Sequence, residues 1–475
     1  MNFQKLVHAT TKNVVFYRDS HNAEALFVEY ENDLGAICFD RLDSLGFRSF
    51  LLMKSLEVTN EKQSLNPDKA IAYIRAFFSY HSSPQKVDIF IRTAGDLSQG
   101  IEYDLKDDDR RSVIVDQNGW VVTSNKKHKF LTPSTALEQV EPKQPQQGLL
   151  ELLRPFVNLH GNDYLLFVIW LVQAFCSGNH NAVLLNAPKG SGKSTLARVV
   201  RALIEPCEVD ITPLSKKIDD VVNILSNLYL VCYDNVRSIS QEQSDTLCVA
   251  ITGSTVTKRA LFTNNDLCVQ KLRNVVLING ISAIPKEADL AERFLVVTLD
   301  KIDAAKRKRE KDFWDSFHKT LPYILGAIFD TLSSAMTYMQ SLSLANMPRM
   351  ADAFADMLCI AMALGLTEDE FRSMYDENVE KMNQLRSSSP LVNAVQEYMD
   401  GPMAGKRFAK DKAEPLFEAI RANYSGKKSD LPGSASHFTQ ALDKEFENLK
   451  NASLRANIDD TNAMGTTVTI IRRKK

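Results

Sequence analysis

The sequence predicts an α/β protein whose central feature is a parallel sheet flanked by helices. Three apolar runs of strand length are separated by segments with helical periodicity, and each ends in a polar or glycine-rich turn: 183–186, 228–233 and 274–278. Buried parallel strands are typically continuous apolar runs rather than alternating ones. Such strands also need long crossover connections, which helices usually supply. The middle of the chain therefore predicts strands that alternate with helices.

The turn after the first of these strands carries a nucleotide-binding motif. It runs Ala187-Pro188-Lys189-Gly190-Ser191-Gly192-Lys193-Ser194-Thr195, with Ala187 in place of the usual first glycine. Small residues allow consecutive backbone N–H groups to surround a phosphate, and the helix N-terminus adds partial positive charge. We expect Lys193 to reach the β- and γ-phosphates of ATP and Ser194 to ligate Mg²⁺. The alternative is an ordinary strand–turn–helix that binds nothing.

Two more strands end in residues suited to the same site. Asp234 follows the second strand, where its carboxylate can hold Mg²⁺ through water at the carboxyl edge of the sheet. Asn279 ends the third strand and can orient the attacking water and sense the γ-phosphate. Arg293 precedes a last strand at 294–299, at the edge of the domain where a neighbouring subunit's γ-phosphate would lie.

The amino-acid composition limits the kinds of protein that this chain can be. A chain of 475 residues with 44% hydrophobic and 24% charged residues is typical of a soluble protein of several domains. Its net charge of −2 gives no global attraction to nucleic acid, so any such binding must come from local patches. The seven cysteines form no C-x-x-C pair, which favours reduced thiols in a cytoplasmic protein. We expect neither a signal peptide nor a membrane partner.

The order of patterns along the chain predicts five regions: a mixed α/β accessory domain (1–130), a linker (131–148), the nucleotide-binding core (149–305), a helical lid (306–385) and a C-terminal domain (386–475). In the first region a helix at 67–81 has Asn66 as its predicted N-cap, and Asn118-Gly119 predicts a hairpin turn. The acidic run 104–109 predicts a solvated turn rather than a metal site. Apolar residues at helical spacing after Trp314 predict core packing in the lid.

Two regions carry candidate DNA-binding residues. The segment 255–272 predicts a basic hairpin that bears Lys258, Arg259 and Lys271. The C-terminal domain shows three helical patterns followed by two strand-like runs, which predicts a winged helix whose third helix begins at Ser434 and continues to about residue 450. Its exposed candidates for a DNA groove are Ser436, His437, Gln440 and Lys444. A solvated hairpin and a protein-binding winged helix remain the alternatives.

Longer strings of residues resemble a known family. The segments that carry the resemblance are 101–105, 119–122, 234–236, 244–248, 278–281, 289–293 and 347–352. Together with the phosphate-binding motif they resemble superfamily 3-type AAA+ helicases, and in particular the helicase module of phage and mobile-element primase–helicases. The resemblance covers roughly residues 85–365. Only the phosphate-binding motif is highly specific by itself.

The resemblance implies a role for each matching residue. Lys193 and Ser194 would bind phosphates and Mg²⁺, Asp234 the metal, and Asn279 would be the first sensor of the γ-phosphate. Arg293 would be an arginine finger acting on the adjacent subunit, and Arg349 a second sensor supplied by the lid. The basic hairpin would project into the central channel of a ring and contact DNA there.

Two departures from the family pattern matter. Many relatives carry two adjacent acids at the second motif, whereas here Tyr233 and Asn235 flank the single Asp234. The group that polarises the attacking water is therefore open between Asp234, Asp245 and Asn235, and slow hydrolysis is compatible with the sequence. Relatives also often carry a primase upstream. Residues 1–150 are too few and too poor in catalytic carboxylates for one, so a separate primase is one candidate partner.

These observations predict an ATP-dependent and Mg²⁺-dependent DNA helicase. We expect a homohexamer that draws one DNA strand through its channel during replication of a phage or mobile element, in the bacterial host cytoplasm. The C-terminal domain could add duplex recognition. Two alternatives stay open: an AAA+ ATPase that remodels or loads protein partners in defence or transposition, and a nucleotide-gated DNA-binding switch with little hydrolysis.

Overall fold

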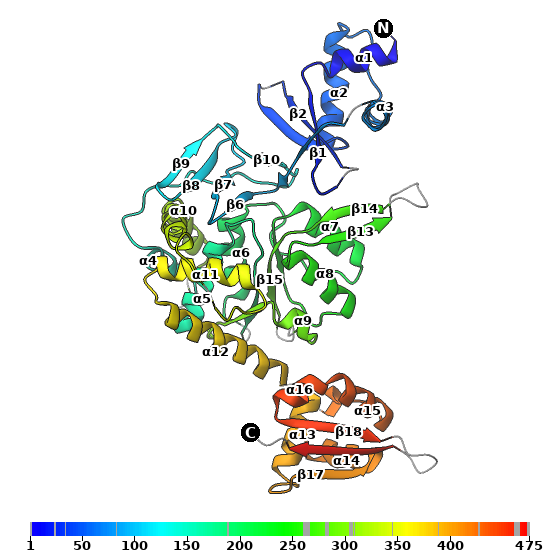
Figure 1. Ribbon diagram of the computed structural model, residues 1–475, viewed down its shortest axis with the longest axis vertical. Helices are drawn as coiled ribbons and strands as arrows, with labels where there is room; N and C mark the ends of the chain where they lie inside the picture. The colour runs from blue at the N-terminus through cyan, green and yellow to red at the C-terminus, as the bar shows by residue number, and fades with distance from the viewer. Residues whose placement is uncertain are drawn as a thin grey trace. The chain divides into compact units, whose positions relative to one another are not determined.

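A computed structural model of the protein divides into two compact units, one of residues 1–283 with 297–372 and one of residues 284–296 with 373–475. Figure 1 follows the chain through both units by colour. The structure describes residues 2–22, 25–33, 35–81, 83–187, 190–259, 267–280, 285–303, 307, 309–343, 345–387, 389–425, 428–459 and 466–472.

The first unit begins with a small lobe of three helices and four strands. Its elements are α1 (Phe3–Thr10), β1 (Val15–Asp19), β2 (Leu26–Glu31), β3 (Ile37–Arg41), α2 (Leu45–Val58), α3 (Pro67–Tyr80) and β4 (Gln85–Val87). The sheet has the order β3-β2-β1-β4. Buried Phe47, Leu51 and Ile71 pack the helices into one core with this sheet. The predicted helix α3 is confirmed, because Asn66 caps it by accepting from the Lys69 N–H.

A second, antiparallel sheet follows, which we call the meander. Its strands are β6 (Thr93–Asp96), β7 (Gly100–Asp104), β8 (Ser112–Asp116) and β9 (Gly119–Thr123), and a short pair flanks it, β5 (Ile89–Phe90) with β10 (Lys129–Phe130). The predicted hairpin turn at Asn118-Gly119 is confirmed, since Asp116 pairs with Gly119. The N-terminal 130 residues thus carry two separate four-stranded sheets.

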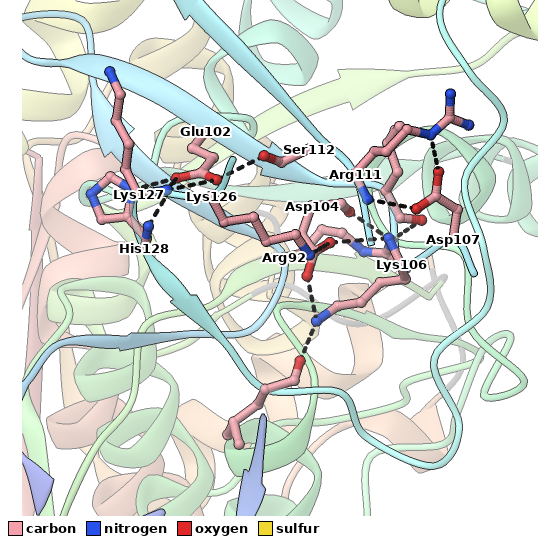
Figure 2. Close-up of polar contacts among 12 residues, drawn as sticks. Arg92, Glu102, Asp104, Lys106, Asp107, Arg111, Ser112, Lys126, Lys127 and His128 are labelled. Carbon is pink, nitrogen blue, oxygen red and sulfur yellow. Dashed lines mark hydrogen bonds and ion pairs between the residues drawn. The ribbon is translucent and has the colours of Figure 1, made fainter. Parts of the chain in front are cut away.

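The prediction of a solvated acidic turn is wrong for Asp104. This residue ends strand β7 and is only 1% exposed. Lys106 and Lys126 point toward its carboxylate (Figure 2), with Nζ–O distances of 2.9 and 2.6 Å. A buried carboxylate needs such partners, because an unpaired charge is costly to remove from water.

The core of the first unit holds the predicted parallel strands. Its elements are α4 (Leu149–Leu153), α5 (Gly161–Gln173), β11 (Ala182–Asn186), α6 (Lys193–Ile204), α7 (Ile218–Asn227), β12 (Leu230–Tyr233), α8 (Gln241–Ile251), β13 (Thr255–Arg259), β14 (Leu267–Lys271) and β15 (Val275–Asn279). The sheet order is β12-β15-β11-β16, with β15 parallel to both β11 and β12. Its fourth strand, β16 (Phe294–Thr298), has its last two residues in the first unit.

Two long helices complete the first unit. They are α10 (Glu310–Met339) and α11 (Ala351–Ala363), and α12 (Glu368–Ser387) begins there and continues in the second unit. The predicted apolar stripe of α10 is buried at Phe317, Ile324 and Phe329, which confirms core packing. The predicted linker lacks helix and strand apart from one isolated bridge, yet it packs tightly. A Cβ on Gly326 of α10 would lie 1.9 Å from the Lys143 carbonyl oxygen, so only glycine fits beneath it.

The second unit contains a compact α/β domain at the C-terminal end. Besides α9 (Ala288–Ala291), its elements are α13 (Pro390–Asp400), β17 (Phe408–Lys412), α14 (Ala413–Asn423), α15 (Ala435–Lys444), α16 (Phe446–Asn451), β18 (Leu454–Asp459) and β19 (Thr467–Arg472). The antiparallel sheet has the order β17-β19-β18, and α14 and α15 contact its strands (Figure 1). Val395, Phe417, Phe438, Leu442 and Ile470 are buried together in its core.

The structure corrects the predicted elements of this domain in two places. Strand β17 was not expected, and the third helix does not run unbroken to residue 450. It ends at Lys444, and α16 begins after Glu445. The predicted N-cap is confirmed, because the Ser434 hydroxyl accepts from the His437 N–H at 3.3 Å.

Candidate nucleotide-binding site

The turn between β11 and α6 has the backbone that a phosphate-binding loop requires. Gly190 and Gly192 have φ values of 82° and 81°, a left-handed conformation that glycine adopts without a steric penalty. Gly192 is the N-cap of α6, so the first N–H groups of that helix point out of the turn. Pro188 and Lys189 of the motif lie outside the described residues.

The residues predicted from three separate strands line one cavity. It has a volume of about 450 Å³ and is bounded by Gly190, Ser191, Gly192, Lys193, Ser194, Thr195, Asp234, Asn235, Asn279 and Gly280. The topology explains this convergence. The loop follows β11, Asp234 follows β12 and Asn279 ends β15, and the carboxyl ends of adjacent parallel strands meet at one edge of the sheet. Ala187, although part of the motif, is buried.

The polar side chains of the cavity contact one another. The Ser194 hydroxyl donates to one oxygen of Asp234 at 3.4 Å, and the amide of Asn279 donates to the other. The backbone holds the acid in place, because the Asp234 N–H donates to the carbonyl of Thr212 at 2.9 Å. Asp234 therefore faces both the start of α6 and the end of β15.

Lys193 is held back against its own loop. Its Nζ donates to the Ala187 carbonyl at 2.7 Å. Partial burial lowers the pKa of Lys193, although the nearby Asp234 carboxylate opposes this shift. The flexible side chain can exchange the carbonyl for a phosphate oxygen, which is a stronger partner for a cation.

The oxygen atoms of the cavity suit Mg²⁺. This ion prefers hard oxygen ligands and is usually bound through one or two carboxylates together with waters and substrate phosphates. The Ser194 hydroxyl and the Asp234 carboxylate face each other as one such pair. Among the described residues no group of three or more His, Cys, Asp or Glu side chains could hold a metal alone. A Mg²⁺ ion held by Ser194 and Asp234 would take its other ligands from waters and substrate phosphates.

Sequence reasoning missed the residues that brace the loop. The Asn158 amide donates to the carbonyls of Ser191 and Asp300, at 3.2 and 2.6 Å. The Ile302 N–H donates to the Gly190 carbonyl at 3.4 Å. Residues on both sides of the core in the sequence thus lie against the loop. No local pattern around Asn158 signals this role, because the contacts span more than 30 residues.

Sequence reasoning also missed a buried acid behind the loop. Glu205 follows α6 and is 3% exposed. Its carboxylate accepts from the N–H groups of Tyr229 and Leu230, at 3.1 and 2.8 Å, and from the Arg201 guanidinium at 3.1 Å. It therefore joins the end of α6 to the start of β12, the strand that presents Asp234.

The two predicted arginines do not line this cavity. Arg293 belongs to the second unit, where its guanidinium forms an ion pair with Asp289 at 2.8 Å. Arg349 is exposed just before α11. Their roles as arginine finger and second sensor stay predictions.

The candidate DNA-binding residues are distributed over both units. β13 and β14 pair as the expected hairpin, but the side chains of Lys258 and Arg259 lie outside what the structure describes. Lys271 pairs with Thr255 at the base of that hairpin, and its Nζ lies 3.1 Å from His21 Nε2 in the N-terminal lobe. On α15 the four candidate side chains are exposed, opposite buried Phe438 and Leu442: Ser436, His437, Gln440 and Lys444.

Comparison with known proteins gives one family match. The family model of the actinomycete integrative conjugative element replication protein matches residues 150–380. That stretch contains the phosphate-binding loop and every residue that lines the cavity. No curated protein matches the chain. Among the described residues, no helix has the length and apolar character needed to cross a membrane.

Solved structures match at low identity. The A form apo structure of the NrS-1 C-terminal region is 10% identical, covers 98% of each chain and has a TM-score of 0.40. Another apo structure of that region, residues 305–718, is 12% identical over 98% of this chain and 97% of that one, with a TM-score of 0.39. A JCV helicase with a bound small molecule is 16% identical over 49% of this chain and 70% of that one, with a TM-score of 0.23.

Proposed function

We propose that this protein is an ATP- and Mg²⁺-dependent DNA helicase that acts in the replication of a phage or mobile genetic element. The observation that carries the proposal is the convergence of Lys193, Ser194, Asp234 and Asn279 on one cavity. P-loop enzymes bind a nucleoside triphosphate with a lysine and a hydroxyl at the N-terminus of a helix that follows a parallel strand, together with a carboxylate after a second strand. The match to a conjugative element replication protein supports a role in the replication of a mobile element.

In this proposal the protein is a P-loop ATPase of the AAA+ type with three additions. The lid is the helical segment 306–385, which contains α10, α11 and most of α12. The C-terminal domain is a winged helix, which the order α13-β17-α14-α15-α16 followed by β18 and β19 supports. Its exposed α15 residues would contact duplex DNA, and the β13–β14 hairpin would contact a single strand through its backbone phosphates.

The working form would be a homohexamer. Arg293 of one subunit would stabilise the charge that develops on the γ-phosphate bound by its neighbour. To do so it must exchange its ion pair with Asp289 for the phosphate.

Unwinding of a forked DNA duplex tests the proposal. Wild type with Mg²⁺ and ATP should unwind the fork, single-stranded DNA should raise its ATPase rate, and both effects should need Lys193. Mass measurement with an ATP analogue and DNA should give six subunits. A protein that stays a single subunit under every nucleotide and DNA condition, and hydrolyses ATP at full rate as Arg293→Ala, would contradict the helicase.

A nucleotide-gated DNA-binding switch is the second candidate, and one feature of the cavity favours it. Asp234 is the single acid among the described residues that line the cavity, and the residue after it is Asn235. A base that activates water is usually a second carboxylate or a similarly placed group. Comparison of ATP turnover by wild type and Asp234→Ala separates the two functions. A switch predicts negligible turnover by both, with ATP-dependent binding of DNA by wild type.

A further inference from the structure

The C-terminal end of helix α6 is closed by side chains from the meander and the segment that follows it. The last carbonyl groups of a helix have no partner within the helix, and water usually satisfies them. Here the Gln139 amide donates to the carbonyls of Ala202 and Leu203, both at 3.0 Å. The Tyr103 hydroxyl donates to the carbonyl of Ile204 at 3.1 Å. Both side chains are buried.

A buried arginine extends this closure beyond the helix. Arg92 is 1% exposed and donates to four carbonyls that lie in three separate segments. Its acceptors are Asp104 at 3.0 Å, Leu105 at 3.4 Å, Leu137 at 2.8 Å and Pro206 at 2.9 Å. The guanidinium therefore ties β7 and the segment before Gln139 to Pro206, two residues past the end of α6. We call Arg92, Tyr103 and Gln139 the socket.

The charge around the socket suits the end of a helix. Lys106 and Lys126 flank the Asp104 carboxylate, and Arg92 lies beside them (Figure 2). The cluster thus holds three cations and one anion, and the buried Glu205 carboxylate just past the helix is paired with Arg201. The C-terminal end of a helix carries a partial negative charge, so an excess of positive charge nearby is favourable.

Helix α6 connects the socket to the phosphate-binding loop. The helix has 12 residues, so its ends are about 18 Å apart. Its first residues, Lys193 and Ser194, line the nucleotide cavity, and its last carbonyls sit in the socket. A helix fixed at its C-terminal end holds its N-terminal N–H groups, the Lys193 stem and the Ser194 hydroxyl in one place.

We propose that Arg92, Tyr103 and Gln139 are positioning residues for the bound nucleotide. They touch neither nucleotide nor metal and act through α6. The inference rests on the proposed function, in that α6 must be the helix that binds ATP. It also makes residues 92–139, outside the stretch that matches the replication protein family, part of the ATPase machinery.

Gln139→Met is the variant that tests the socket, because it keeps the length of the side chain and removes both donors. The matched control is Glu138→Met at the exposed neighbouring position. Gln139→Met loses the amide's hydrogen bonds to Ala202, Leu203 and Tyr103, and the acceptor of the Val140 N–H. Because part of this loss falls on folding, we expect Mg-ATP binding to weaken about three- to tenfold. The control should bind like wild type. Tyr103→Phe, which removes one donor, is the milder variant if Gln139→Met folds poorly.

Amide hydrogen exchange shows whether the socket positions α6 for nucleotide binding or only stabilises the fold. In wild type, Mg-ATP should protect residues 199–206 as well as the loop at 190–196. In Gln139→Met the protection at 199–206 should be lost while that of the loop persists. A variant that melts earlier but matches wild type in ATP affinity and in the exchange pattern would overturn the inference alone. Wild type that binds no ATP would overturn the proposed function and the inference together.

Discussion

The two ends of helix α6 differ in almost every property. At the N-terminal end, glycines with left-handed backbone leave an open cavity of about 450 Å³, and Lys193 is partly exposed. At the C-terminal end, buried Tyr103, Gln139 and Arg92 fill the space and take up the carbonyls. One end turns the first N–H groups of the helix toward a cavity. At the other end, buried side-chain donors bind the last carbonyl groups. The open end has space for a ligand, whereas the closed end is held by side-chain hydrogen bonds.

The comparison separates two kinds of mutational effect. Changes at the open end should remove ligand binding and leave the fold intact, because few internal contacts depend on those side chains. Changes at the closed end should lower the free energy of unfolding, because they leave buried polar groups without partners. Each prediction below tests one side of this contrast.

The largest effect is expected at the open end, for Lys193→Ala. The change removes the cation that would contact the β- and γ-phosphates, and it should reduce ATP hydrolysis at least about 100-fold. Steady-state ATPase assays measure this. The melting temperature without nucleotide should stay within about 2 °C, as for most surface substitutions. Lys216→Ala, at an exposed position before α7, is the control and should hydrolyse ATP like wild type.

The next largest effect is expected at the closed end, for Arg92→Leu. Removal of the guanidinium takes one donor from four carbonyls, two of them in buried and two in part-buried hydrogen bonds, and the free energy of unfolding should fall by about 3–5 kcal/mol. Urea denaturation measures it. Arg198→Ala on α6 itself is the matched control, because its ion pair with Asp210 is about 40% exposed and should be worth less than about 1 kcal/mol. Equal losses in the two variants would contradict the contrast.

The same contrast explains what the sequence could predict. The open end is encoded by consecutive residues, 187–195, so a local motif was enough to identify the loop. Asp234 and Asn279 were predictable because each ends an apolar run, and parallel topology brings such ends together. Asn158 and Gln139 were not predictable, because each acts through contacts more than 30 residues away in the sequence.

Charge patterns in the sequence also gave a wrong prediction where residues distant in the sequence determine whether a side chain is buried. Asp104 lies in an acidic run that resembles a solvated turn, but Lys126, which lies 22 residues later, folds back to pair with it. In the C-terminal domain the strand β17 is too polar for a pattern of alternation to reveal it. Its burial pattern shows one buried residue, Ala409. Pairing with β19 makes it a strand, and that pairing joins residues about 60 positions apart.

A third prediction concerns the buried ions beside the socket. Asp104→Asn leaves the ammonium groups of Lys106 and Lys126 without their counter-charge, and should cost about 2–3 kcal/mol of unfolding free energy. Burial lowers the pKa of Lys106 to about 8 although Asp104 lies beside it, so without the carboxylate this lysine should lose its proton at still lower pH.

A double-mutant cycle measures that coupling. Lys106→Met combined with Asp104→Asn should cost less than the sum of the two single changes, because the pair is then absent rather than broken. Urea denaturation at pH 7 gives the four free energies. If the losses of unfolding free energy in the two single variants add up to the loss in the double variant, Asp104 and Lys106 are not coupled and their ion pair does not stabilise the closed end.

The smallest effect is expected at a buried acid that has acidic neighbours in place of lysines. Asp356 of α11 is 9% exposed, and burial raises its pKa to about 7, with the charges of Asp96 and Asp352 adding to the shift. The folded protein therefore keeps this proton up to about pH 7, whereas the unfolded chain loses it near the ordinary value of 3.8. Unfolding releases the proton between these values, so wild type should lose stability as the pH rises from about 4 to about 7.

Asp356→Asn removes that dependence, because the amide mimics the protonated acid at every pH. The variant should match wild type at pH 4.5 and exceed it at pH 8 by about 1–2 kcal/mol, below the ceiling of about 4 kcal/mol that three pKa units allow. Thermal unfolding across this range measures the difference. Asp369→Asn at an exposed position of α12 is the control and should show no such trend. A constant offset between wild type and Asp356→Asn at all pH values would mean that Asp356 is not protonated in the fold. Its burial would then resemble that of Asp104, with a counter-charge that holds it ionised.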